Sequence, residues 1–113
     1  MLDLSQKTAT IKAVNDEISN LTYAPDLAGA VKKLVSENFP YGIYHLTNSG
    51  FASWYEIAKE IFTITGKQID LQPVPSSYFP RKASRPKKSV LINTKFPALR
   101  PWQEALKEFL QRN

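Results

Sequence analysis

The residues best suited to chemistry lie in a basic, proline-rich loop that spans roughly residues 75 to 88. Its charged side chains are Arg81, Lys82, Arg85, Lys87 and Lys88, and Tyr78 lies near its start. Arginine binds phosphate through a planar fork of N–H donors, and a nearby aromatic ring offers a face to a base or a sugar. Prolines restrict the backbone, which lowers the entropy that the loop loses on binding. The loop is a candidate site for an anionic ligand. The same residue types also occur in loops that bind nucleic acid and in solvent-exposed loops whose charges only keep a protein soluble.

The positive charge of the chain is concentrated around this loop. The net charge is +5, yet the stretch from Leu71 to Gln103 contains no acidic residue and seven of the 15 basic ones. The remaining residues carry eight basic and ten acidic side chains, a balance of −2. A nucleic-acid-binding module is therefore the less favoured reading, because the basic residues lie on one segment and the rest of the chain is slightly acidic.

Other chemical groups are scarce. A dinucleotide site needs a glycine-rich turn between a strand and a helix, but Gly29, Gly42, Gly50 and Gly66 are at least eight residues apart. The single histidine, His45, has no acidic or cysteine neighbour in sequence and is interpreted as structural. There is no cysteine and no metal-ligand spacing. We therefore expect no catalytic, cofactor-binding or metal-binding residue in this chain.

Size and composition predict a single small domain or a piece of a larger one. The chain has 113 residues, of which 42% are hydrophobic and 12% aromatic, as in globular proteins. No apolar run approaches the ~20 residues that span a membrane, and the N-terminus does not resemble a signal peptide. The absence of cysteine suits the cytoplasm, which is the predicted location.

The hydrophobic pattern predicts an α/β or α+β fold of about three helices with short strands. The helices are expected at residues 24–36 and 53–65 and from Pro101 onward, and the strands at 9–14, 42–47 and 68–74, with a short extended segment at 89–92. Ser53 and Glu56 form a capping box, and Gly66 is a natural helix stop. Trp54 and Trp102 lie on apolar stripes and are expected in the core. The prolines predict an extended, non-helical loop.

Three motifs occur together in a fixed order. The first runs from Gly42 to Gly50 and is followed by Ser53-Trp54-Tyr55-Glu56. The second is Arg85-Pro86, then Ser89-Val90-Leu91 and Asn93-Thr94-Lys95, and the third is the segment from Trp102 to Leu106. This ordered set resembles the C-terminal portion of the dTDP-4-dehydrorhamnose reductases, which belong to the extended short-chain dehydrogenase/reductase group and make dTDP-L-rhamnose.

The resemblance implies a division of labour. In this family an N-terminal Rossmann domain binds NADPH or NADH, a Tyr-x-x-x-Lys pair supports hydride transfer, and the C-terminal portion closes over the dTDP-sugar. Residues 1–113 would then be one substrate-binding domain or fragment, without the cofactor fingerprint and the Tyr-x-x-x-Lys pair. With a dTDP-sugar as the implied ligand, residue type and placement in the loop lead us to expect Arg81 and Arg85 to contact the nucleotide diphosphate, with Tyr78 beside the base or sugar. A lobe without its Rossmann partner is expected to self-associate or to be only marginally stable, because it leaves apolar surface uncovered.

The sequence also departs from the family pattern. Ser19 and Leu21 stand where family members carry Gly and Pro, which changes the backbone preferences of the segment after the first strand. A non-catalytic relative of the same fold, the β subunit of methionine adenosyltransferase, shows that such a chain can be regulatory. A regulatory or binding protein of this fold is therefore the alternative to part of a reductase.

Overall fold

The computed structural model describes residues 1–112, which form two compact units. Unit 1 combines Met1–Ser19 with Ala52–Ser89, and unit 2 combines Asn20–Phe51 with the chain from Val90 onward. The mixed α/β class predicted from the hydrophobic pattern is confirmed.

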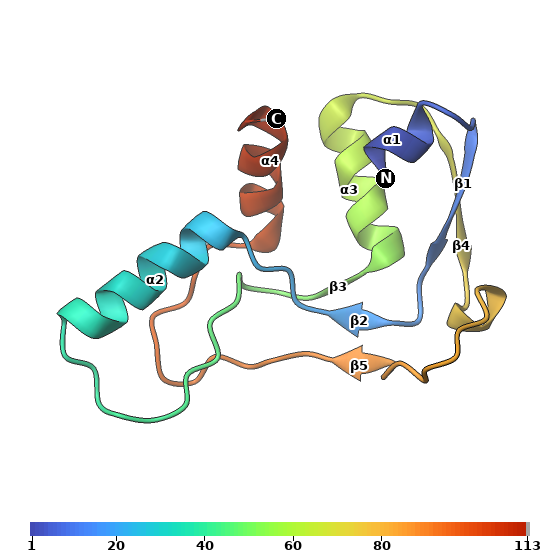
Figure 1. Cartoon of the computed structure of the whole chain (residues 1–113). Helices are drawn as coiled ribbons and strands as arrows, with labels where there is room; N and C mark the ends of the chain where they lie inside the picture. The colour runs from blue at the N-terminus through green and yellow to red at the C-terminus, as the bar shows by residue number, and fades with distance from the viewer. Residues whose placement is uncertain (113) are drawn as a thin grey trace. The chain divides into compact units, whose positions relative to one another are not determined.

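Unit 1 holds all five strands that occur within residues 1–112. Its elements are α1 (Leu2–Ser5), β1 (Thr10–Val14), β2 (Ile18–Ser19), β3 (Ala52–Ser53), α3 (Trp54–Thr65), β4 (Asp70–Val74), the 3₁₀ helix η1 (Ser76–Tyr78) and β5 (Lys88–Ser89). Strands β1 and β4 pair in parallel, with Ile11 opposite Leu71, and β2 lies between β3 and β5 in a second, three-stranded sheet. Figure 1 shows the two short arrows of β2 and β5 side by side.

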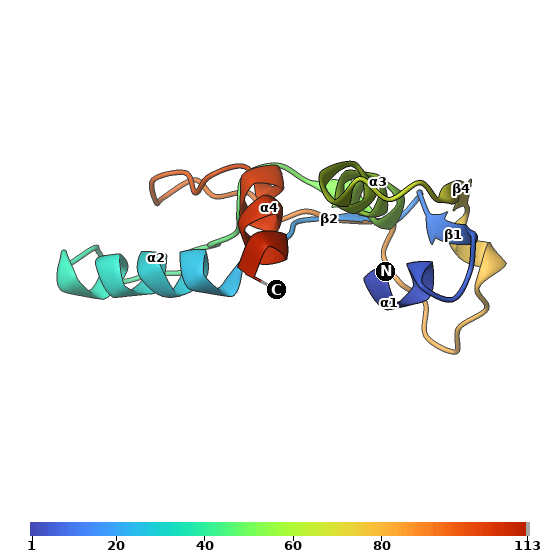
Figure 2. The same cartoon turned by 90° about the horizontal axis from the view of Figure 1, so that it is seen from above.

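The core of unit 1 lies between α3 and the β1–β4 pair (Figure 2). Alternation along β1 directs Ile11 and Ala13 inward, where they meet Ala58 and Phe62 of α3. Full burial of a side chain such as Ile or Phe contributes about 1.5–3 kcal/mol, so Ile11 and Phe62 contribute most within this cluster.

Helix α3 begins and ends as its sequence predicts. The Ser53 backbone N–H donates to the Glu56 carboxylate (2.7 Å), and the Glu56 N–H donates to the Ser53 hydroxyl (3.2 Å). The predicted capping box is confirmed, and Gly66 closes the helix in the left-handed region at φ 67°. Trp54, however, is 47% exposed, so its predicted place in the core is wrong. The helix starts directly after β3, so its first residue lies beside the three-stranded sheet and not over β1 and β4.

Unit 2 contains α2 (Ala24–Ser36) and α4 (Trp102–Arg112), and Arg100 links them by pairing with Asp26 of α2 and Glu108 of α4. Asn48 is fully buried, accepts the Tyr23 N–H (2.7 Å) and donates to the carboxylate of Asp26 (2.7 Å). Trp102 is buried as predicted, and it packs so closely on Gly50 that a Cβ at that position would lie 3.1 Å from the indole. Gly50 also has φ 89°, a conformation that side chains disfavour.

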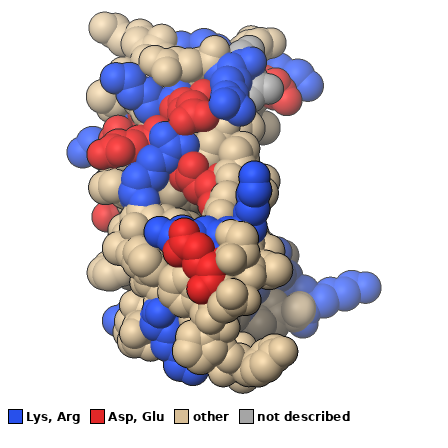
Figure 3. Space-filling model, turned by 90° about the vertical axis from the view of Figure 1, so that its left-hand side faces the viewer, with Lys and Arg blue, Asp and Glu red and all other residues tan. Residues whose placement is uncertain are grey.

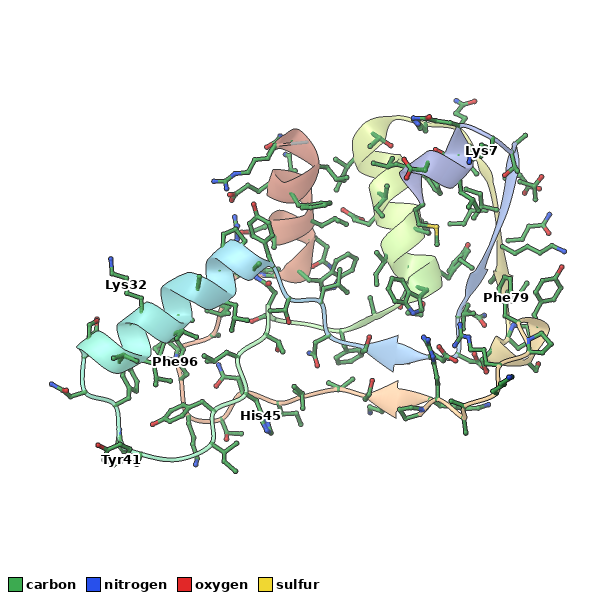
Figure 4. All side chains as sticks on the ribbon, in the orientation of Figure 1. Lys7, Lys32, Tyr41, His45, Phe79 and Phe96 are labelled. Carbon is green, nitrogen blue, oxygen red and sulfur yellow. The ribbon has the colours of Figure 1, made fainter. Side chains whose placement is uncertain are left out.

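The predicted strand at residues 42–47 is wrong. The structure assigns no strand there, and Ser49 alone forms an isolated bridge, to Pro101. A strand needs a neighbour to complete its backbone hydrogen bonds, and no segment within residues 1–112 pairs with this one. Ile43 is accordingly 78% exposed, and the labelled His45 lies on this unpaired segment in Figure 4.

Two smaller predictions also need correction. The basic loop is not wholly extended, because η1 forms directly after Pro75 and the Tyr78 N–H donates to the Pro75 carbonyl (3.0 Å). Proline is compatible with the position that precedes a helix, where its missing N–H costs nothing. The α-helices within residues 1–112 number four, one more than predicted, since the short α1 precedes β1.

Candidate functional site

The three-stranded sheet of unit 1 brings three distant segments to one edge. Ile18 of β2 stands opposite both Ser53 of β3 and Lys88 of β5. Because β5 runs parallel to β2, the residues just before these strands lie at the same edge. Because β3 runs antiparallel to β2, the residue just after β3 lies there too. The edge therefore gathers Glu17, Trp54 and the last part of the basic loop.

Two hollows lie along this edge. The larger, which we call the loop hollow, has a volume of about 430 Å³ and is lined by Ser76, Phe79, Arg81 and Arg85 among others. The smaller, the edge hollow, has a volume of about 170 Å³. Its lining consists of Glu17, Ile18, Ser19, Trp54, Arg85, Pro86 and Ser89. Glu17 and Arg85 line both hollows, so they form the boundary between them.

The carboxylate of Asp16 anchors the basic loop to the segment just before β2. Asp16 accepts hydrogen bonds from the backbone N–H (2.7 Å) and the hydroxyl (3.1 Å) of Ser76, and it pairs with Lys87 at 3.5 Å. Burial alone would raise the pKa of Asp16, but the hydrogen bonds from Ser76 and the charge of Lys87 outweigh it, and the pKa lies below its ordinary value. Asp16 is thus ionised at neutral pH and anchors η1.

Arg81 and Arg85 meet at the loop hollow but differ in their partners. One nitrogen of Arg81, Nη1, donates to both oxygens of the buried Glu17 carboxylate, at 3.1 and 3.2 Å. Arg85 is exposed, and no hydrogen bond or ion pair within residues 1–112 occupies its guanidinium. Arg85 therefore keeps its full fork of donors for a ligand, and Arg81 keeps part of its own.

Tyr78 lies apart from both arginines. Its hydroxyl accepts a hydrogen bond from the Lys12 ammonium (2.6 Å), which also lies 4.5 Å from the centre of the ring. Tyr78 lines neither hollow, whereas its neighbour Phe79 lines the loop hollow and is labelled at the end of η1 in Figure 4. The role predicted for Tyr78 beside a base or sugar stays a prediction.

Sequence reasoning missed three residues of this edge: Glu17, Trp54 and Phe79. Trp54 was not recognised because its spacing along the helix is typical of core residues. Phe79 had a usable signal, because it stands in the same loop as Arg81 and two residues away from it. The contact of Glu17 with Arg81 has no local signal, because the two residues are 64 positions apart in sequence.

The sequence does contain the Tyr-x-x-x-Lys spacing, contrary to expectation. It occurs twice, at Tyr55–Lys59 and at Tyr78–Lys82. The ring of Tyr55 packs against the core of unit 1, and the hydroxyl of Tyr78 is bonded to Lys12. Within residues 1–112 neither tyrosine is hydrogen-bonded to the lysine of its own pair, and we assign no catalytic role to either pair.

Unit 2 has a hollow of a different kind. It measures about 510 Å³ and is lined mainly by apolar side chains of the segment before α2 and of α4, including Leu21, Trp102 and Leu106. Its polar neighbour Asn48 is already committed to Asp26 and the backbone. No group of three or more His, Cys, Asp or Glu side chains within residues 1–112 is arranged to hold a metal ion. No helix in that range is long and apolar enough to cross a bilayer.

The fold thus defines a small mixed α/β domain with its polar hollows at one edge of a short sheet. The chain belongs to the RmlD substrate binding domain family, whose model matches residues 1–113. This match confirms the resemblance seen in the three ordered motifs.

Relatives of this chain are longer proteins. It is 41% identical to the spore coat polysaccharide biosynthesis protein SpsK of Bacillus subtilis (strain 168), over 98% of this chain and 40% of that protein. It is 36% identical to a dTDP-4-dehydrorhamnose reductase of Aggregatibacter actinomycetemcomitans, over 95% of this chain and 42% of that protein. The chain therefore spans about two-fifths of the length of these curated relatives.

Solved structures give the same result. A dTDP-4-dehydrorhamnose reductase of Clostridium acetobutylicum ATCC 824 superposes with a TM-score of 0.90 at 38% identity, over 98% of this chain and 41% of that one. The corresponding enzyme of Bacillus anthracis str. Ames, solved in complex with NADP, also gives 0.90, at 32% identity over 99% of this chain and 41% of that one.

Proposed function

We propose that this chain is the dTDP-sugar-binding part of an NAD(P)H-dependent dTDP-4-dehydrorhamnose reductase that acts in dTDP-L-rhamnose synthesis. The observation that carries the proposal is the meeting of Arg81 and Arg85 at one hollow, in a chain that belongs to a substrate-binding family. Charge-assisted bonds from a guanidinium to phosphate are short, strong and directional. The two arginines are the groups that suit the diphosphate of a nucleotide sugar.

The two arginines would share this task unequally. Arg85 has no competing carboxylate, so both of its terminal nitrogens are free to grip one phosphate. Arg81 is held in place by Glu17 through one nitrogen, which fixes its position and leaves its remaining donors for the second phosphate. Tyr78 is the predicted neighbour of the base or sugar, and Phe79 is a second aromatic candidate on the loop hollow.

We propose that the remaining steps of the reaction are carried out by the part of the enzyme that corresponds to the portion of the relatives outside this match. A Rossmann domain with NADPH or NADH would deliver the hydride, while the residues of this chain bind the substrate, orient it and shield it from water. We further propose a cytoplasmic location. We also propose that the isolated chain self-associates, because side chains such as Tyr41, Ile43 and Ile92 are largely exposed.

Calorimetric titration of the chain with dTDP tests the proposal. Arg85→Ala should weaken binding roughly 10- to 150-fold, since a hydrogen bond to a charged group is worth about 1.5–3 kcal/mol. Lys82→Ala is the matched control, because it removes the same charge from the same loop at a residue that lines neither hollow.

Equal losses in the two variants would mean that the loop attracts anions by net charge alone. Unchanged affinity in Arg85→Ala would remove the diphosphate role of that residue. No binding of dTDP by the unaltered chain would defeat the proposal that this part binds the nucleotide by itself.

A further inference from the structure

Trp54 occupies a place that its sequence position does not explain. Its spacing puts it on the apolar stripe of α3, yet its side chain is 47% exposed while Ile57, Ala58 and Phe62 are buried. An exposed aromatic residue alone needs no explanation. Trp54, however, also lines the edge hollow, where a carboxylate and an unpaired guanidinium face the same space.

The edge hollow has the chemistry that a sugar ring needs. Trp54 offers a flat apolar surface, Glu17 offers carboxylate oxygens, and Ser19 and Ser89 offer hydroxyl groups. One face of a sugar ring is made largely of C–H groups and packs on an aromatic ring, while its hydroxyls need acceptors and donors at the rim. Each oxygen of Glu17 has a further lone pair beyond the one used by Arg81, so it can accept a sugar hydroxyl.

The sizes of the two hollows also suit a sugar ring in the edge hollow and a nucleoside in the loop hollow. The edge hollow, at about 170 Å³, is smaller than the roughly 300–1,000 Å³ of sites that enclose a drug-sized ligand, so it has room for about one ring. The loop hollow, at about 430 Å³, falls within that range and has the aromatic ring of Phe79 for a base. Arg85 stands at the boundary, as the diphosphate stands between nucleoside and sugar.

We propose that Trp54 is the sugar-recognising residue of this chain, and that a nucleoside diphosphate sugar lies across the edge of the sheet. Its sugar ring stacks on the indole in the edge hollow, its diphosphate is held at Arg85, and its nucleoside enters the loop hollow beside Phe79. This inference rests on the proposed function, and it adds the direction in which the ligand lies.

The test compares two ligands, dTDP and dTDP-L-rhamnose, by calorimetric titration of the chain. Trp54→Leu should weaken dTDP-L-rhamnose roughly 2- to 10-fold and leave dTDP unchanged, because stacking on an aromatic ring is worth about 0.5–1.5 kcal/mol. Trp54→Phe should recover part of the loss, because it restores an aromatic face. Phe79→Leu is the matched control and should weaken both ligands by the same factor, since both carry the nucleoside.

A loss that is equal for the two ligands in Trp54→Leu would place the indole at the nucleoside and overturn the inference. So would a Trp54→Leu variant that binds both ligands normally while Arg85→Ala loses both, and that result would leave the proposed function standing. Failure of the unaltered chain to bind either ligand would defeat the proposed function, and the inference with it. Trp54 is exposed at the start of a capped helix, so Trp54→Leu is expected to fold, as circular dichroism would verify.

Discussion

Arginines in the two units serve opposite purposes, although they belong to one basic stretch of the sequence. In unit 2 the guanidinium of Arg100 is held by two carboxylates. It donates to both oxygens of Asp26, at 2.8 and 2.9 Å, and pairs with Glu108 at 2.7 Å. In unit 1 Arg85 has no carboxylate partner within residues 1–112, and Arg81 uses a single nitrogen. The first arginine holds helices together, and the other two face hollows.

The difference shows that whether an arginine is structural or available to a ligand depends on the carboxylates that lie beside it. Asp26 lies in the first turn of α2, where a negative charge is favourable, and it is also the centre of a network with Asn48 and Arg100. Hydrogen bonds from Arg100 lower the pKa of Asp26, and they outweigh the effect of burial, which would raise it. The pKa of Arg100 is raised by the same contacts.

The strongest test of this contrast is a pair of arginine substitutions. Arg100→Ala should lower the free energy of unfolding by roughly 2–3 kcal/mol, because it leaves partly buried Asp26 without its charged donor. Arg85→Ala should change it by less than about 0.5 kcal/mol, because it removes no internal contact. Urea denaturation measures both, with the fluorescence of buried Trp102 as the probe in a Trp54→Phe background. Similar costs for the two variants would break the distinction between structural and ligand-facing arginines.

A smaller effect is expected from acid. The pKa of Asp26 is lowered in the folded chain, so its contribution to stability is present above its ordinary pKa of about 4 and is lost as the pH falls through the lowered value. The urea midpoint should therefore drop below about pH 4. Arg100→Ala should show a shallower drop, because Asp26 then loses most of the cause of its low pKa. An equally steep decline in both proteins would assign the acid sensitivity to other carboxylates, such as Asp16.

The sequence predicted the helices better than the strands, for a physical reason. The bounds of α2 match the prediction of 24–36, and α3 matches it to within one residue, because caps, stops and spacing are all local signals. The strand expected at 42–47 has the right side chains but depends on a partner far away in sequence. Strand β2 was missed because it is two residues long and exists only through its pairing with β3 and β5.

The residues of the candidate site show the same contrast between local signals and long-range pairing. Arg81 and Arg85 were found because arginines in a proline-rich loop are recognisable from type and spacing. Glu17 and Trp54 were missed because their place at the edge follows from the order of three short strands, which no local pattern reveals. Tyr78 was chosen for its ring, but the sequence gives no sign that Lys12 would occupy its hydroxyl.

The smallest effect is expected with nucleic acid, the alternative that the basic stretch left open. Three of its seven basic residues, Arg81, Lys87 and Arg100, are paired with carboxylates, and Lys95 lies in the other unit from the loop. On the surface drawn in Figure 3, Lys and Arg side chains are interspersed with Asp and Glu. Binding to random duplex DNA needs several cations that together release counterions, with an affinity that falls steeply as salt rises.

We therefore expect no salt-dependent binding of a fluorescent 20-base-pair duplex at 50 mM salt by anisotropy, in the unaltered chain or in Lys82→Ala. Glu17→Gln is the variant that could break this expectation, because it releases Arg81 next to the unpaired Arg85 and so enlarges the free positive charge of the loop. Binding that appears only in Glu17→Gln would show that internal carboxylates keep the loop from acting as a nucleic-acid surface. Steep salt-dependent binding by the unaltered chain would show instead that pairing with carboxylates does not prevent these basic residues from binding DNA.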